Sequence, residues 1–126
     1  MAVKYKLVER GNPQDASAPK KFYAQPIVSG KMEVKEISKD IEDLSSLSYG
    51  DISNVLLSLV RQIPKYLANG NSVKLGDFGS LRLGFSSEGV EDPTEFTVKK
   101  IKGQKIIFTP GPDLKDFLGK LKFEKG

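Results

Sequence analysis

Apolar and basic residues alternate in Val3–Val8, which is the period of a half-buried β-strand. The stretch 11–19 is made of Gly, Asn, Pro, Gln, Asp, Ala and Ser, and it predicts a loop. Phe22–Val28 returns to strand-forming residues, with Pro26 better suited to an edge strand than to a central one. We therefore expect residues 1–31 to form a hairpin with a long loop.

The period then changes to that of helices. Val34, Ile37, Ile41 and Leu44 share one face and predict a helix over Met32–Leu44. A second helix is expected from a capping pair at Ser48 and Asp51 to about Ala68, with a kink or a tightened last turn at Pro64. Its apolar positions cover more than one narrow stripe, which indicates burial on two sides and favours a dimer interface.

Beyond Asn69 and Gly70 the strand period returns. The expected strands are Val73–Leu75, Ser80–Phe85 and a returning strand made of Val98–Lys102 and Lys105–Phe108, with a bulge or bend at Gly103-Gln104. The glycines of Gly76–Gly79 predict a tight turn with Phe78 as a core anchor, and 86–97 is polar and acidic. Pro112 predicts the start of a last helix that carries Leu114, Phe117, Leu118 and Leu121.

Composition narrows the possible chemistry. The chain has no cysteine and no histidine, which excludes disulfides, thiolate nucleophiles, imidazole bases and the usual zinc sites. Nothing spaces the remaining carboxylates, lysines and hydroxyls for catalysis. We therefore expect no enzymatic activity, no cofactor, no metal and no small-molecule substrate. Since no apolar run approaches the roughly 18 residues of a membrane span, we expect no membrane partner and a cytoplasmic location.

The charge is unevenly distributed. The net charge is +4, and residues 1–31 hold six basic against two acidic groups. Residues 32–67 hold four basic and six acidic groups. Residues 68–126 hold ten basic and eight acidic groups. This pattern permits a polyanionic partner, and it is equally compatible with an ordinary solvated surface.

Two glycine-containing motifs occur in the second half of the chain. Gly70–Leu81 contains a helix stop, a strand and Gly-x-Phe-Gly before a second strand. Phe108-Thr109-Pro110-Gly111 is followed by Leu114 and Lys115 in the expected last helix. In this order the two motifs resemble the HU/IHF family of bacterial histone-like proteins, in which Phe-x-Pro-Gly precedes the last helix. The resemblance covers about residues 33–121, and the extra amino-terminal segment is similar to a divergent branch of HU-related proteins in Bacteroidetes.

The resemblance implies an α+β, HU/IHF-like fold. Two helices precede a three-stranded antiparallel sheet with a β-arm and a carboxy-terminal helix, and an amino-terminal β-hairpin is added. The domains expected are an extension over 1–31 and an HU-like DNA-binding domain over 32–126. The family implies an intertwined dimer, most simply a homodimer, whose arms follow the minor groove of double-stranded DNA and kink it with an apolar wedge. The location implied is the nucleoid, and a role in DNA condensation follows.

Basic residues near the expected arm are the candidate DNA contacts. They are Arg82, Lys99, Lys100, Lys102 and Lys105, of which alternation would place Lys100, Lys102 and Arg82 on one sheet face. The alternative is a solvated face whose lysines protect a sheet edge. Pro93 corresponds by position to the wedge at the arm tip, although Asp-Pro-Thr-Glu is also typical of a turn or helix start.

The amino-terminal hairpin carries a second basic group, which consists of Lys4, Lys6, Lys20 and Lys21. It could add phosphate contacts, or it could lie along the sheet and lengthen it. The function expected is therefore sequence-tolerant, architectural DNA binding. The alternative is a structural or protein-interaction module that keeps the HU scaffold without strong DNA binding, which is favoured by the carboxylates of Glu91, Asp92 and Glu95 around Pro93.

Overall fold

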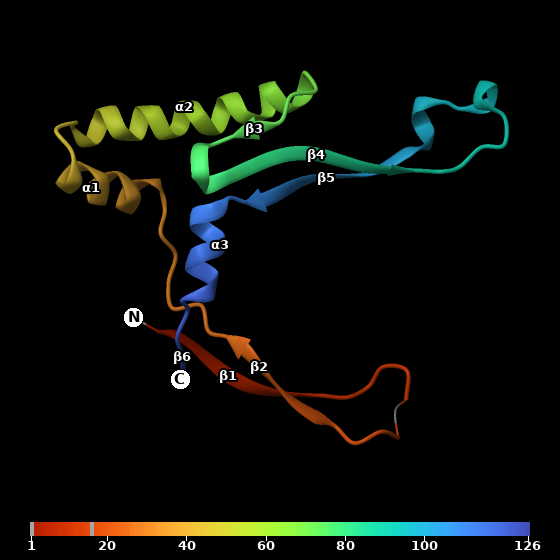
Figure 1. Cartoon of the computed structure of the whole chain (residues 1–126), viewed down its shortest axis with the longest axis horizontal. Helices are drawn as coiled ribbons and strands as arrows, with labels where there is room; N and C mark the ends of the chain where they lie inside the picture. Colours follow the sequence, from red (N-terminus) through yellow and green to blue (C-terminus); the bar gives the residue numbers. More distant parts are fainter. Residues whose placement is uncertain (1, 16) are drawn as a thin grey trace.

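The computed structural model describes residues 2–15 and 17–126. In this part of the chain, three α-helices and two three-stranded sheets form a mixed α+β arrangement (Figure 1). The strands are β1 (Val3–Arg10), β2 (Lys21–Pro26), β3 (Val73–Lys74), β4 (Gly79–Ser87), β5 (Ile101–Pro110) and β6 (Phe123–Lys125). The helices are α1 (Val34–Leu44), α2 (Tyr49–Ala68) and α3 (Pro112–Gly119), and three short 3-10 turns, η1 (Gly76–Phe78), η2 (Pro93–Glu95) and η3 (Val98–Lys100), complete the order.

The first sheet contains the predicted hairpin and one strand that the sequence did not indicate. β1 pairs antiparallel with β2, from Tyr5 opposite Pro26 to Arg10 opposite Lys21. β6 pairs parallel with the start of β1, with Val3 opposite Phe123. The sheet order is therefore β2-β1-β6, and it joins the two ends of the described chain (Figure 1).

Local chemistry sets the ends of α1 and α2. The Glu33 N–H donates to the Glu36 carboxylate at 3.1 Å, so α1 begins at Val34 and not at the predicted Met32. The Ser48 hydroxyl accepts from the Asp51 N–H at 3.2 Å, as the capping pair predicted. α2 includes Pro64 and ends at Ala68, as predicted for the helix end.

The two family-like motifs meet in space. The Gly111 N–H donates to the Phe78 carbonyl oxygen at 2.9 Å, and the rings of Phe78 and Phe108 lie 5.4 Å apart between centroids. A Cβ on Gly111 would lie only 2.7 Å from the carbonyl carbon of Asp77, and one on Gly79 only 2.6 Å from the Thr109 oxygen. Gly79 also has a positive φ of 149°. These glycines therefore allow the turn before β4 and the end of β5 to pack directly together.

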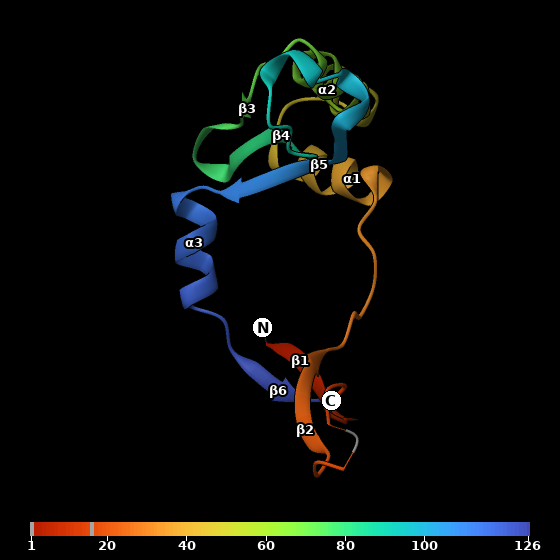
Figure 2. The ribbon, with the colours of Figure 1, turned by 90° about the vertical axis from the view of Figure 1, so that its right-hand side faces the viewer.

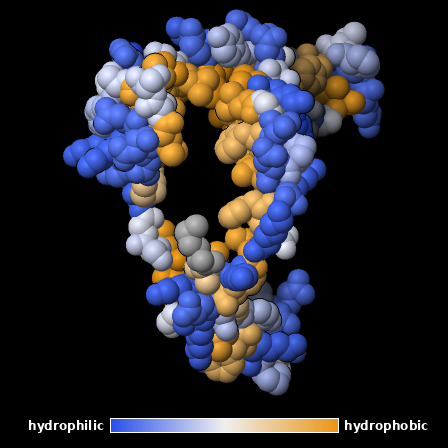
Figure 3. Space-filling model, turned by 60° about the vertical axis from the view of Figure 1, so that its left-hand side comes forward, coloured by the Kyte–Doolittle hydropathy of each residue, from blue (hydrophilic) through white to orange (hydrophobic). Residues whose placement is uncertain are grey.

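The chain buries very little of itself. Among the described residues, only Ile52 and Leu67 are buried hydrophobic side chains. Hydrophobic side chains on α2 and α3 are largely open, with Val55 exposed to 62% and Phe117 to 56%. The second sheet and the α1–α2 pair are linked to the hairpin sheet mainly through α3 and the segment 27–33 (Figure 2). Figure 3 shows an opening through the molecule that is bordered largely by hydrophobic surface.

The predicted elements are present, with differences at their ends. Val98–Lys100 forms a 3-10 turn and not the start of the returning strand, because the chain is still turning at that point. The last helix ends at Gly119, so Leu121 lies beyond it. No helix in residues 2–15 and 17–126 combines the length and the apolar character needed to cross a membrane.

Candidate nucleic-acid interface

β4 and β5 form a two-stranded ribbon that projects from the body of the molecule (Figure 1). Directly opposed residues of an antiparallel pair have their side chains on the same face. Arg82 lies opposite Ile107, and Gly84 lies opposite Lys105. The neighbouring positions Leu81 and Leu83 lie on the other face. The ribbon therefore has a basic face and an apolar face.

A bulge brings a third cation onto the basic face. Ser86, two residues after Gly84, lies opposite Lys102, whereas Lys102 and Lys105 are three residues apart. In a regular strand that spacing would place the two lysines on opposite faces. The extra residue in β5 corrects the alternation, and the positive φ of 66° at Gly103 permits the bulge. The predicted bulge thus aligns Arg82, Lys102 and Lys105.

The cations on this face differ in their electrostatic surroundings. The Lys102 ammonium lies 3.6 Å from the Glu88 carboxylate, and both side chains are more than half exposed. Among the described residues, Arg82 and Lys105 have no carboxylate within ion-pair distance. An exposed pair of this kind contributes little to stability, so Lys102 can exchange Glu88 for another anion at small cost.

The tip of the ribbon is compact and acidic. The Glu88 N–H donates to the Lys100 carbonyl oxygen at 2.9 Å, beyond which the chain forms η2 and η3. Pro93 is the first residue of η2, and the Asp92 carboxylate accepts from the Thr94 N–H at 3.1 Å. The side chains of Glu91, Asp92 and Glu95 are exposed around the proline. Pro93 thus occupies a helix start at the far end of the ribbon.

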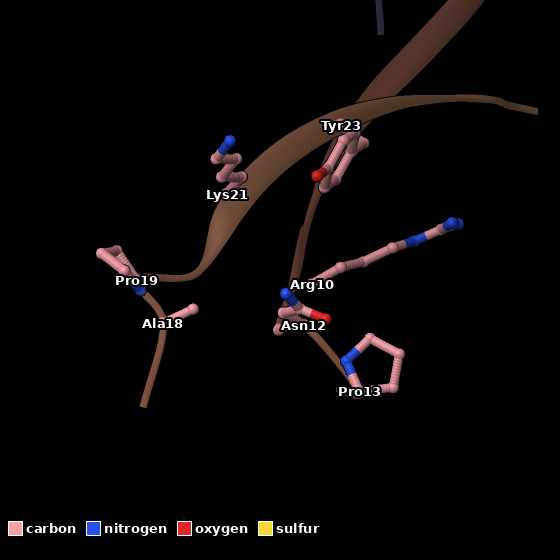
Figure 4. Close-up of a pocket in the computed structure, with 8 residues that line it drawn as sticks. Arg10, Asn12, Pro13, Ala18, Pro19, Lys21 and Tyr23 are labelled. Atoms are coloured by element: carbon pink, nitrogen blue, oxygen red, sulfur yellow. The ribbon is translucent and has the colours of Figure 1, made fainter. Parts of the chain in front are cut away.

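The hairpin presents a separate group of cations. Lys6 pairs with Gln25, and Arg10 pairs with Lys21, so these side chains share one face of the β1–β2 pair. Tyr23 lies opposite Val8 on the same face. Arg10, Lys21 and Tyr23 line an open hollow of about 550 Å³ at the hairpin end, together with Asn12 and prolines of the loop (Figure 4).

The hairpin loop holds one carboxylate in a defined geometry. The Ser17 hydroxyl donates to Asp15 Oδ1 at 2.6 Å, and the Ser17 N–H donates to the same oxygen at 3.1 Å. These hydrogen bonds stabilise the ionised carboxylate and lower the pKa of Asp15 below its usual value, the hydroxyl having the larger effect. Asp15 is fully exposed and remains ionised at neutral pH.

Comparison with known proteins identifies the family. Residues 1–125 match the family described as "HU domain fused to wHTH, Ig, or Glycine-rich motif". This chain belongs to the HU-HIG family. Comparison with curated proteins gives no match.

Two solved structures have a fold similar to that of this chain. One is from Bacteroides vulgatus and is described as a "putative bacterial DNA binding protein", with a TM-score of 0.65 and 15% identity over 98% of this chain and 47% of that chain. The other is HU from Anabaena in a cocrystal with DNA, with a TM-score of 0.55 and 16% identity over 71% of this chain and 99% of that chain. This chain spans about half the length of the Bacteroides protein. The HU resemblance expected from the two glycine motifs is confirmed.

The HU-HIG fold brings some predicted site residues together and separates others. Arg82, Lys102 and Lys105 share the basic face of the ribbon. The prediction that Lys100 shares this strand face is wrong, because Lys99 and Lys100 lie in η3, where the chain turns. Of the hairpin lysines, Lys4, Lys6 and Lys21 lie on strands, and Lys20 ends the loop before β2.

Sequence reasoning missed Arg10 as a candidate contact. Arg10 was included in the charge count of residues 1–31, but the predicted alternating strand extended only to Val8. No pattern in the sequence paired Arg10 with Lys21. The hairpin register places the two residues opposite each other. No group of three or more Asp or Glu residues within the described chain could hold a metal ion.

Proposed function

We propose that this chain forms a homodimer that binds double-stranded DNA as an architectural protein, without a chemical step. Its contacts are to phosphates and the minor groove, and they do not depend strongly on sequence. The observation that carries the proposal is the alignment of Arg82, Lys102 and Lys105 on one face of a projecting ribbon in an HU-HIG chain. The nucleoid of the bacterial cytoplasm is the location that fits such a role, and DNA condensation is its expected effect.

The exposed surface of the chain supports the dimer. A folded monomer of 13.9 kDa exposes roughly 6,700 Å² by the usual scaling of area with mass. This chain exposes 10681 Å². The projecting ribbon and hairpin account for part of the excess of about 4,000 Å². An obligate homodimer interface commonly buries 2,000–5,000 Å² in total, or roughly 1,000–2,500 Å² per chain, and burial of this size fits the hydrophobic part of the excess.

The ribbon supports DNA binding through its shape and charge. A two-stranded ribbon is narrow enough to enter a groove of DNA. Three cations on each ribbon give six in a dimer, so the logarithm of the affinity should fall with the logarithm of salt with a slope of about −5 or steeper. Contacts of this kind carry little sequence information, because phosphates are the same at every base pair.

A titration of labelled 30-base-pair duplex DNA at several salt concentrations tests the proposal. We expect binding near 50 mM salt at micromolar protein, with an affinity lower by roughly a thousandfold at 200 mM. Arg82→Gln with Lys105→Gln removes four cations per dimer and should reduce the slope by about 3.6. Absence of binding at 50 mM salt would refute the proposal.

A second candidate function is a structural or protein-interaction module on the same scaffold. The exposed carboxylates of Glu91, Asp92 and Glu95 at the ribbon tip favour it, because they would repel phosphates. The two functions differ in one measurement. If Lys102→Glu with Lys105→Glu leaves the DNA affinity of a folded protein unchanged, the ribbon does not bind DNA and the second function gains.

A further inference from the structure

The hairpin sheet has two faces of opposite chemistry. The pairing of β1 with β2 places apolar side chains on one face, which are Val3, Tyr5, Leu7, Phe22, Ala24 and Pro26, and the register with β6 adds Phe123. The other face carries Lys4, Lys6, Arg10 and Lys21, with Val8, Tyr23 and Gln25 between them. A solvated strand face is expected to be polar, but it has no need for charges of one sign. This face of the β1–β2 pair carries four cations and no carboxylate, which favours an anionic partner.

These cations are available to an external anion. Within the described residues, the ion pairs are Lys31–Glu33, Lys102–Glu88 and Lys120–Asp116, so Lys6, Arg10 and Lys21 take part in none. All three are exposed. Glu9, between Val8 and Arg10, belongs to the apolar face because side chains alternate along a strand. Among the described strand residues, Lys4 alone of these cations has an acidic neighbour in its own sheet row, which is Glu124 in the register with β6.

The spacing of the cations matches an extended polyanion better than a small ligand. From Lys4 to Arg10 the strand advances by about 20 Å, at roughly 3.3 Å per residue. That length corresponds to about six base pairs of DNA, which rise 3.4 Å each. The hollow at the hairpin end is open and is lined by Arg10, Lys21 and Tyr23. Figure 4 shows these side chains coming from neighbouring strands at the border of the hollow.

The direction of the hairpin agrees with a role beside the ribbon. The ribbon of β4 and β5 and the hairpin of β1 and β2 project to the same side of α3 (Figure 1). The view turned by 90° shows both projections coming toward the viewer (Figure 2). An elongated polyanion held by the ribbon would therefore lie on the side of the molecule from which the hairpin also projects.

We propose that the basic face of the hairpin, formed by Lys6, Arg10 and Lys21 with Lys4 at its edge, is a second binding surface for DNA phosphates. This inference rests on the proposed function, because it adds phosphate contacts to a DNA-binding dimer. The affinity it supplies is electrostatic and independent of base sequence. Each phosphate neutralised adds about 0.9 to the magnitude of the salt slope.

The test compares two triple variants with equal loss of charge. The hairpin variant is Lys6→Gln, Arg10→Gln and Lys21→Gln. The control variant is Lys35→Gln, Lys39→Gln and Lys115→Gln, whose side chains are exposed on α1 and α3. Both variants lose three positive charges. A general effect of net charge would therefore change the salt slope of DNA affinity equally in both variants.

We expect the hairpin variant to bind the 30-base-pair duplex with a slope smaller in magnitude by about 2.7 if one hairpin of the dimer contacts DNA, and by about 5 if both do. The control variant should keep the wild-type slope to within one unit. A third variant, Lys6→Arg with Lys21→Arg, keeps the charge and should also keep the slope. Circular dichroism of each variant confirms that it is folded.

The outcomes separate this inference from the proposed function. If the wild-type protein binds DNA and the folded hairpin variant has the same slope as the control variant, the hairpin surface does not bind phosphates and the inference is overturned. If the wild-type protein does not bind DNA at 50 mM salt, the proposed function is refuted, and the inference that rests on it is refuted with it. Equal loss in both triple variants would also overturn the inference, because net charge alone would then explain it.

Discussion

Replacement of Gly111 by alanine tests how the two family motifs hold the second sheet. An added Cβ would lie 2.7 Å from the Asp77 carbonyl carbon and 3.0 Å from the Gly79 nitrogen. Ordinary van der Waals contact begins near 3.4 Å, so the backbone would have to move by at least about 0.7 Å (3.4 minus 2.7). The movement must be larger to clear the Asp77 carbonyl oxygen, which is the atom nearest to the added Cβ. That movement weakens the 2.9 Å hydrogen bond from the Gly111 N–H to the Phe78 oxygen.

The expected loss of stability combines two effects. Forcing a methyl group against backbone costs roughly 1–3 kcal/mol. The weakened hydrogen bond adds about 1 kcal/mol. We therefore expect Gly111→Ala to lower the free energy of unfolding by roughly 2–4 kcal/mol per chain. The hydrophobic contact between Phe78 and Phe108 should loosen at the same time, because the same turn positions both rings.

Urea denaturation followed by circular dichroism measures this loss. All variants are measured at one protein concentration, because the stability of the proposed dimer would depend on concentration. Gly89→Ala is the matched control, since its φ is not in the positive range and, among the described residues other than its chain neighbours, no atom lies within 4 Å of its added Cβ. The control should change stability by less than about 1 kcal/mol. If Gly111→Ala were as stable as this control, the close approach of the two turns would not contribute to folding.

Three further results are expected. Glu88→Gln frees Lys102 and removes a carboxylate, so DNA affinity at low salt should rise up to about fivefold in the titration; a fall in affinity would contradict the role given to this face. Val55→Asp puts a charge on a hydrophobic side chain that is exposed on α2, and it should weaken the proposed dimer by roughly a thousandfold or more in sedimentation equilibrium; a folded wild-type monomer would contradict the proposed dimer. Ser17→Ala removes the main hydrogen bond to the Asp15 carboxylate, so its pKa should rise toward the usual value in an NMR titration; an unchanged pKa would refute that cause.

Local patterns were sufficient to predict most of the helices, turns and strands. The spacing of three and four residues in α1 and α2 is repeated often enough to be read directly, and the Ser48–Asp51 pair marks a start that the hydrogen bond confirms. The glycines of Gly76–Gly79 and the bulge at Gly103 were also predicted, because unusual backbone angles leave few residue types. These features depend on residues that are close together in the sequence.

Features that depend on distant partners could not be predicted. β6 has three residues, which is too short for a period, and its partner Val3 is 120 positions away from Phe123. Lys99 and Lys100 follow a β-branched valine and resemble a strand, but η2 and η3 continue the turn at the ribbon tip. For the candidate site, the bulge was predicted, but its effect on which lysines align was not. The same is true of the match between Arg10 and Lys21, since it requires the hairpin register.

The parallel pairing of β6 with β1 has a consequence for the order of folding. Closing a loop of about 120 residues has an entropic cost whose length-dependent part alone is roughly 4 kcal/mol. Three residue pairs cannot offset this cost alone. These strands can therefore join only after α3 and the intervening segments have brought them near each other. Hydrogen exchange should then find the β6 amides among the first to open, so that the hairpin separates from the rest of the protein before the helices unfold.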